Sequence, residues 1–168
     1  MCPVALSQGR YTARHDRIIQ YWIENKCDNG SKIYADIDGY RTHGGTIPPN
    51  LMVTEQRPDI VIHSPEGITL VELTVPFDTE RAIADARLRK RSRYNQLECD
   101  FSDIGVKCES IYVEIGARGL ITKDNKSALT YLARKLGISK VSNFIAMSGR
   151  KSLEGSRIIY NARNSPQW

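Results

Sequence analysis

Two acids, Asp59 and Glu72, each stand beside a strand-like run of apolar residues, and the turn-forming segment 63–67 separates the two runs. A hairpin centred between Pro65 and Glu66 would place Asp59 opposite Glu72. Facing side chains lie about 5 Å apart at Cβ, where two like charges destabilise a strand pair. A divalent cation held between the carboxylates would relieve this repulsion. We therefore expect a metal site at this position.

A lysine on the helix that follows could join the two acids. Asp78 or Thr79 can cap this helix, which we predict to end at about Leu97. At 100° per residue, Lys90 and Tyr94 fall one turn apart on its inward stripe. A lysine on an apolar stripe must reach solvent or find anions, and the two carboxylates would supply them. The Tyr94 hydroxyl could reach the same cluster. The other members of the stripe are Ile83, Ala86 and Leu97.

Each of these four residues also has a structural interpretation. Asp59 could cap a turn, and Glu72 could face solvent on a half-exposed sheet. The ammonium of Lys90 could extend past the helix into water, and Tyr94 could belong to the core. A single cluster accounts for all of them together, and we favour it.

The surrounding elements alternate as they do in α/β proteins. We treat 1–168 as one domain, with a core at about 12–120 and a C-terminal helical extension at about 122–163. The expected elements are a helix at 12–26 capped by Thr12, a strand at 32–37, a Gly- and Pro-rich mobile loop at 39–56, strands at 57–62 and 68–75, a helix at 79–97, a strand at 110–115, a helix at 122–136, and a helical tail at 139–163 interrupted at Gly149 and Gly155.

Composition favours a globular protein without a membrane span. Charged residues make up 26% of the chain, and no apolar run approaches the roughly 20 residues that cross a bilayer. The N-terminus lacks the order of a signal peptide, so we expect an intracellular protein with reduced thiols rather than disulfides. The cysteines are scattered at Cys2, Cys27, Cys99 and Cys108.

Basic residues near the acids suggest a nucleic-acid partner. The net charge is +5, and arginines flank the helix that carries Lys90. Guanidinium groups suit phosphate oxygens in geometry and charge, although such arginines can also simply solvate a helix. The residues that we expect to contact nucleic acid are Arg10, Arg14, His15, Arg57, Arg87 and Arg91.

These residues resemble a known family. Pro58-Asp59, Glu72 and a nearby lysine are similar to the motif of the PD-(D/E)xK nuclease superfamily. The commonest form of that motif has its lysine where Thr74 stands here. Lys90, four residues before Tyr94, instead resembles the variant in the restriction-like endonuclease domain of non-LTR retrotransposons.

Sequence before the hairpin extends the resemblance. The segment 9–16 is similar to sequences found just before these retrotransposon domains, after a zinc knuckle whose last cysteine could be Cys2. The resemblance implies a restriction-endonuclease-like core, αβββαβ, with a mixed central sheet flanked by helices and extra C-terminal helices. It further implies a nuclear protein that acts on DNA, with a reverse transcriptase domain of the same polyprotein as a partner.

The resemblance also implies a mechanism. Asp59, Glu72 and the carbonyl of Leu73 would bind Mg²⁺ or Mn²⁺. Lys90 would orient the attacking water or stabilise the transition state, and Tyr94 would position Lys90 or contact a phosphate. The alternatives are a nucleic-acid-binding domain of this fold that does not cut, a resolvase or repair nuclease, and an α/β domain whose acids bind a stabilising cation.

Overall fold

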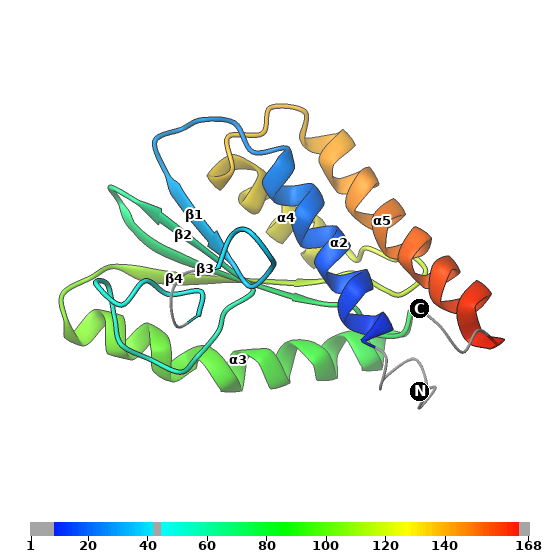
Figure 1. Ribbon diagram of the computed structural model, residues 1–168, viewed down its shortest axis with the longest axis horizontal. Coiled ribbons are helices and arrows are strands. Elements are labelled where there is room, and N and C mark those ends of the chain that lie inside the picture. Colours follow the sequence, from blue (N-terminus) through cyan, green and yellow to red (C-terminus); the bar gives the residue numbers. More distant parts are fainter. Residues whose placement is uncertain (1–8, 42–44, 165–168) are drawn as a thin grey trace.

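A four-stranded mixed sheet lies between helical layers in the computed structural model, which describes residues 9–41 and 45–164 (Figure 1). In spatial order the strands are β1 (Lys32–Ala35), β2 (Ile60–Ser64), β3 (Gly67–Thr74) and β4 (Cys108–Glu114). The first two pairings are antiparallel, and β3 pairs with β4 in parallel. This arrangement confirms the predicted α/β class with a mixed sheet flanked by helices.

The hairpin of β2 and β3 has the predicted register. Ile60 pairs with Val71, so the next step along the ladder places Asp59 opposite Glu72. Gly67 begins β3 with φ 137°, and an added Cβ there would lie 2.3 Å from a backbone oxygen of the loop before β4. Only glycine fits this turn, which therefore helps to fix the register that brings the acids together.

Three helices cover one face of the sheet. They are α2 (Arg10–Glu24), α4 (Lys123–Lys135) and α5 (Val141–Asn161). Their apolar side chains share one core with alternate residues of the inner strands, among them Ile60, Ile62, Val71 and Leu73.

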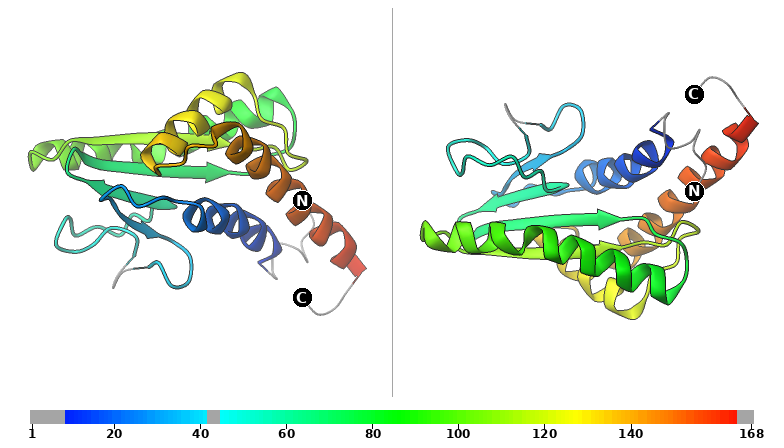
Figure 2. Two further views of the ribbon diagram at one scale, coloured as in Figure 1. Left: turned by 90° about the horizontal axis from the view of Figure 1, so that it is seen from above. Right: turned by 90° about the horizontal axis from the view of Figure 1, so that it is seen from below.

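The opposite face packs against a single long helix, α3 (Glu80–Asp103), which runs along the sheet in Figure 2. Its second core contains Val61 and Leu70 of the hairpin and Tyr94 of the helix. Successive strand residues alternate between faces. Glu72 has the parity of Leu70 and projects toward α3, whereas Asp59, just before β2, contacts both Lys90 of α3 and His15 of α2.

Several predicted boundaries were wrong. Helix α2 begins after Gly9 rather than at Thr12, and it ends at Glu24. Helix α3 has the predicted cap, since the Thr79 hydroxyl accepts from the Ala82 N–H. It continues six residues past Leu97 because Phe101 extends the buried stripe. The first strand ends earlier and β4 starts earlier than expected, at Ala35 and Cys108.

Helix α5 is continuous, so the predicted interruptions at Gly149 and Gly155 were wrong. Both glycines allow close packing instead. An added Cβ at Gly149 would lie 3.0 Å from the carbonyl oxygen of Gly119, and one at Gly155 would lie 2.5 Å from Cγ of Arg14. Helix α4 matches its prediction within one residue at each end and is capped by Thr122.

The loop between β1 and β2 has neither a helix nor a strand element in its described residues, as predicted for 39–56. Ile47 nevertheless anchors it in the core beneath α3. No helix in the described part of the chain is long and apolar enough to cross a membrane. Cys27, Cys99 and Cys108 are free thiols, whereas Cys2 and any zinc knuckle that ends there lie outside the described residues.

Candidate active site

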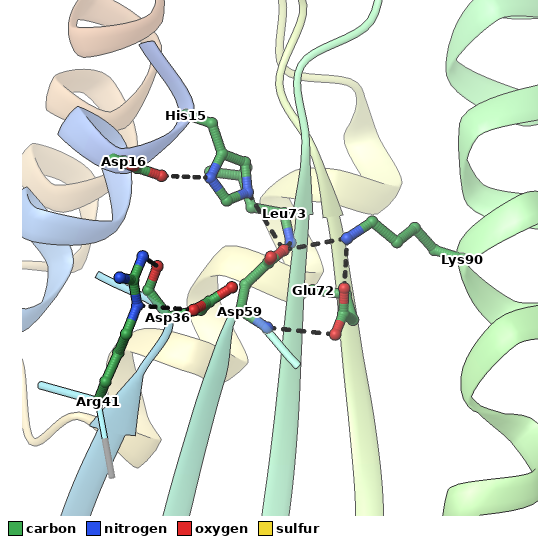
Figure 3. Close-up of polar contacts among 8 residues, drawn as sticks. All are labelled: His15, Asp16, Asp36, Arg41, Asp59, Glu72, Leu73 and Lys90. Atoms are coloured by element: carbon green, nitrogen blue, oxygen red, sulfur yellow. Dashed lines mark hydrogen bonds and ion pairs between the residues drawn. The ribbon is translucent and has the colours of Figure 1, made fainter. Parts of the chain in front are cut away.

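Asp59, Glu72 and Lys90 converge at one point beside the hairpin (Figure 3). Nζ of Lys90 lies 2.5 Å from Oε2 of Glu72 and 3.2 Å from Oδ2 of Asp59. Asp59 immediately precedes β2, Glu72 lies near the C-terminal end of β3, and Lys90 occupies the middle of α3. The two acids and the lysine that the sequence predicted to meet therefore do meet.

One oxygen of Asp59 collects three donors. Its Oδ2 accepts from the backbone N–H of Leu73 at 2.7 Å, from Lys90, and from Nε2 of His15 at 3.2 Å. The backbone N–H of Asp59 donates in turn to Oε1 of Glu72 at 3.3 Å. Glu72 is fully buried and Asp59 is 9% exposed, so both carboxylates depend on these partners for compensation.

Leu73 contributes its amide to the cluster. In a strand, a residue directs its N–H and its C=O toward the same neighbouring chain. Because the Leu73 N–H reaches Asp59, the Leu73 carbonyl projects to the same side. This direction is compatible with the oxygen ligand that the resemblance implies.

His15 is a member of the cluster that the sequence assigned only to nucleic-acid contact. Its Nδ1 lies 3.0 Å from Oδ1 of Asp16, while its other ring nitrogen faces Asp59. The sequence held a signal for this position, because His15 precedes the buried Ile18, Ile19 and Trp22 by three, four and seven residues. Helix α2 thus reaches the site from the face opposite to α3.

The pKa values of the two carboxyl groups are shifted in opposite directions. Burial favours the neutral form of Asp59, but the charges of His15 and Lys90 outweigh it and lower the pKa of Asp59. Burial, followed by the nearby charge of Asp59, raises the pKa of Glu72 to about 8. Burial opposes the charged form of His15, yet Asp59 and Asp16 raise its pKa to about 9. The pKa of Glu72 is therefore raised by burial and by Asp59 even though Lys90 opposes this shift.

Tyr94 lies one turn after Lys90 on the same helix, and its hydroxyl lies near Glu72 at the edge of the cluster. The hydroxyl donates to the backbone carbonyl of Arg57 at 2.9 Å, and the ring is 97% buried in the core beneath α3. Nζ of Lys90 lies 5.9 Å from the ring centroid. Burial and the nearby carboxylates raise the pKa of Tyr94, so its phenol stays neutral. The hydroxyl thus fixes the chain before β2, and Tyr94 also lines the cavity beside Lys90.

Two cavities meet at the cluster. One, of about 460 Å³, opens on the α3 side and is lined by Arg57, Arg93 and Tyr94. The other, of about 430 Å³, opens on the α2 side and is lined by Arg14, His15 and Leu73. Asp36, Asp59 and Lys90 line both cavities.

Three of the arginines predicted to contact nucleic acid instead bind other groups of the protein. Arg10, 1% exposed, donates to the carbonyl of Ala162, and Arg14 donates to Ser156 and to the Val75 carbonyl. They join α2 to the elements packed against it.

Arg87 likewise pairs with buried Glu114 at 2.8 Å and with Asp124 at 3.2 Å. A carboxylate as buried as that of Glu114 requires such a partner. Arg91 is exposed, with its guanidinium 5.7 Å from the ring centroid of Tyr112, and Arg57 is exposed at the mouth of the α3-side cavity. Only these two and His15 remain in positions that a phosphate could approach.

Comparison with known proteins does not assign a family. No protein-family model matches the chain, and no curated protein matches it.

Proposed function

We propose that this protein is a Mg²⁺- or Mn²⁺-dependent DNA endonuclease whose active site contains Asp59, Glu72 and Lys90. The observation that carries the proposal is the position of Lys90, whose ammonium lies between two carboxylates supplied by separate strands. The cluster adjoins two solvent-accessible cavities, so a substrate could reach it.

The order of elements supports the same interpretation. The chain runs α2, β1, β2, β3, α3, β4, with β4 parallel to β3, which follows the αβββαβ order of a restriction-endonuclease-like core. Helices α4 and α5 would be C-terminal additions to that core. Lys90 on α3 would replace the strand lysine whose usual place Thr74 occupies.

The residues fit a hard divalent cation. The two carboxylates and the Leu73 carbonyl would be the protein ligands, and no group of three or more His, Cys, Asp or Glu side chains in the described residues could hold a metal ion. Mg²⁺ commonly binds through one or two carboxylates and keeps several waters or substrate oxygens. A bound cation would also favour the ionised form of Glu72, whose pKa burial raises.

The roles of the residues follow from their positions. Asp59 and Glu72 would hold the ion, and His15 and the Leu73 amide would keep Asp59 in place. When bound, Mg²⁺ or Mn²⁺ polarises the phosphodiester and lowers the pKa of a coordinated water. Lys90 would orient that water or stabilise the charge that develops on the phosphate oxygens.

The resemblance to the endonuclease domain of non-LTR retrotransposons suggests a biological setting. In that setting the protein would cut chromosomal target DNA in the nucleus and act with a reverse transcriptase of the same polyprotein. The residues that support this narrower proposal are the Arg57-Pro58-Asp59 element and the helical pair of Lys90 and Tyr94.

A plasmid-nicking assay tests the proposal. Supercoiled plasmid is incubated with wild type, Lys90→Ala and Glu72→Ala, each with Mg²⁺, Mn²⁺ or EDTA. We expect metal-dependent nicking by the wild type and a loss of at least about 100-fold in both variants, in line with the removal of a group that stabilises the transition state. Wild-type cleavage in EDTA, or cleavage by Glu72→Ala equal to wild type, would contradict the proposal.

A second candidate is a nucleic-acid-binding domain that does not cut. The observation that favours it is the ion pairing at the site, because Lys90 and His15 partner the acids. This candidate predicts salt-dependent DNA binding by a protein that leaves the plasmid intact with either metal.

A further inference from the structure

The two cavities beside Asp59 differ in whether the basic side chains that line them already have hydrogen-bond or ion-pair partners. On the α2 side, Arg41 pairs with Asp36 at 2.9 Å, Arg14 donates to Ser156 and the Val75 carbonyl, and His15 faces Asp59. Each of these side chains therefore already has an acceptor. An incoming phosphate on this side would have to displace existing partners.

The α3-side cavity instead has two arginines whose guanidiniums lack such partners. Arg57 and Arg93 line it, both are exposed, and neither forms an ion pair with any described residue. Glu55 is the unpaired acid of this lining, since Asp36 is held by Arg41 and Asp59 by Lys90. Three acids and three cations line this cavity, but Lys90 is already bound to Asp59, so Arg57 and Arg93 are the lining cations that remain available to a ligand.

Helix α3 holds both arginines at the site. Arg93 belongs to the helix and lies three residues after Lys90, on an adjacent part of its surface. Arg57 lies outside the helix, but the hydroxyl of Tyr94 on α3 donates a hydrogen bond to its backbone carbonyl at 2.9 Å. Tyr94 would thus act as a positioning residue for Arg57.

From this geometry we infer that Arg57 and Arg93 form a phosphate-binding subsite, and that the DNA backbone enters the site through the α3-side cavity. The inference deepens the proposed nuclease function and depends on it only for the name of the substrate. A guanidinium can bind a phosphate through two parallel hydrogen bonds, so paired arginines beside the metal ligands would fix the backbone relative to Lys90.

Arg89 provides a matched control. It is an exposed arginine on the same helix, it carries the same charge, and it does not line the cavity. Binding of a fluorescently labelled DNA duplex is measured by anisotropy in EDTA, over a range of salt concentrations, for wild type, Arg57→Gln, Arg93→Gln, Tyr94→Phe and Arg89→Gln. Circular dichroism confirms that each variant is folded.

We expect Arg57→Gln and Arg93→Gln each to bind about tenfold more weakly, as for the loss of one hydrogen-bonded ion pair, and to lower the salt slope by about 0.9. Tyr94→Phe should weaken binding less and leave the salt slope unchanged, because it keeps every charge. Arg89→Gln should stay within about twofold of wild type.

Two results would overturn the subsite, namely equal losses in all three arginine variants or no binding by the wild type. Plasmid cleavage by the same proteins is scored separately. Selective loss of binding by the two cavity variants with no cleavage by the wild type would support the subsite and reject the nuclease proposal.

Discussion

Asp59 is the residue on which the site depends most. Three donors from three elements meet at its Oδ2, namely His15 of α2, the Leu73 amide of β3 and Lys90 of α3. A carboxylate that accepts several charge-assisted hydrogen bonds is held in one orientation and favours its ionised form. The pKa of Asp59 is accordingly lowered although the side chain is buried.

Glu72 has the opposite electrostatic behaviour and gives a prediction for pH dependence. Its pKa is about 8 in the fold, above the roughly 4.3 expected in an unfolded chain. The folded state thus binds this proton more tightly, and its stability falls as the pH rises between those values. In EDTA, Glu72→Gln should match wild type near pH 4 and unfold on the order of a few degrees higher above pH 8, as measured by thermal denaturation.

Glu109→Gln serves as the control for that measurement. Hydrogen bonds from Lys135 and Tyr131 help to lower the pKa of Glu109 against the effect of its partial burial. Its ionised form therefore stabilises the fold above pH 4, and its replacement should lower the melting temperature at neutral pH. A difference between Glu72→Gln and wild type that stays constant from pH 5 to pH 8 would contradict the assigned pKa.

The contact between α2 and α5 gives a prediction about helix packing. Alanine normally stabilises a helix interior by about 1 kcal/mol relative to glycine. At Gly155, however, a Cβ would lie 2.5 Å from Cγ of Arg14. We expect Gly155→Ala to lower the free energy of unfolding by about 1–2 kcal/mol in urea denaturation, because overpacking outweighs propensity. Arg157→Ala, at an exposed position of α5, should change it by less than about 0.5 kcal/mol. A more stable Gly155→Ala would contradict the close approach.

Local patterns in the sequence predicted the elements whose determinants are close along the chain. The register of the hairpin follows from a turn with Asp59 and Glu72 equidistant from its centre, and the inward direction of Lys90 follows from helical periodicity. Elsewhere the structure depends on long-range contacts, which local sequence patterns do not reveal. The glycines of α5 read as interruptions because their partners, Arg14 and Gly119, lie far away in the sequence.

The internal partners of Arg10, Arg14 and Arg87 were not predicted, for a related reason. Charge alone does not distinguish a phosphate ligand from an internal partner, and Arg87 is bound to the buried Glu114 of β4. His15 entered the site because α2 packs across the sheet, which no local spacing specifies. Its helical spacing to the buried residues Ile18, Ile19 and Trp22 was the available signal.

The cluster connects both helical layers of the whole protein. His15 reaches Asp59 from the layer of α2, α4 and α5, and Lys90 reaches it from α3. These contacts pass the end of β2 and so join the two faces of the sheet at the site (Figure 3). A ligand bound at Asp59 and Glu72 would therefore stabilise the domain as a unit rather than one loop.

Metal-linked stability provides a test that does not require cleavage. A ligand that binds only the folded state raises the free energy of unfolding by about 2.7 kcal/mol at 100 times its dissociation constant, which corresponds to roughly 5–10 °C for a protein of this size. We expect saturating Mn²⁺ to raise the melting temperature of the wild type by about this amount, and EDTA to reverse the shift. Asp59→Asn and Glu72→Gln should each lose most of it, whereas Glu109→Gln should retain it because Glu109 lies outside the cluster. An equal shift in all four proteins would place any bound metal elsewhere on the molecule.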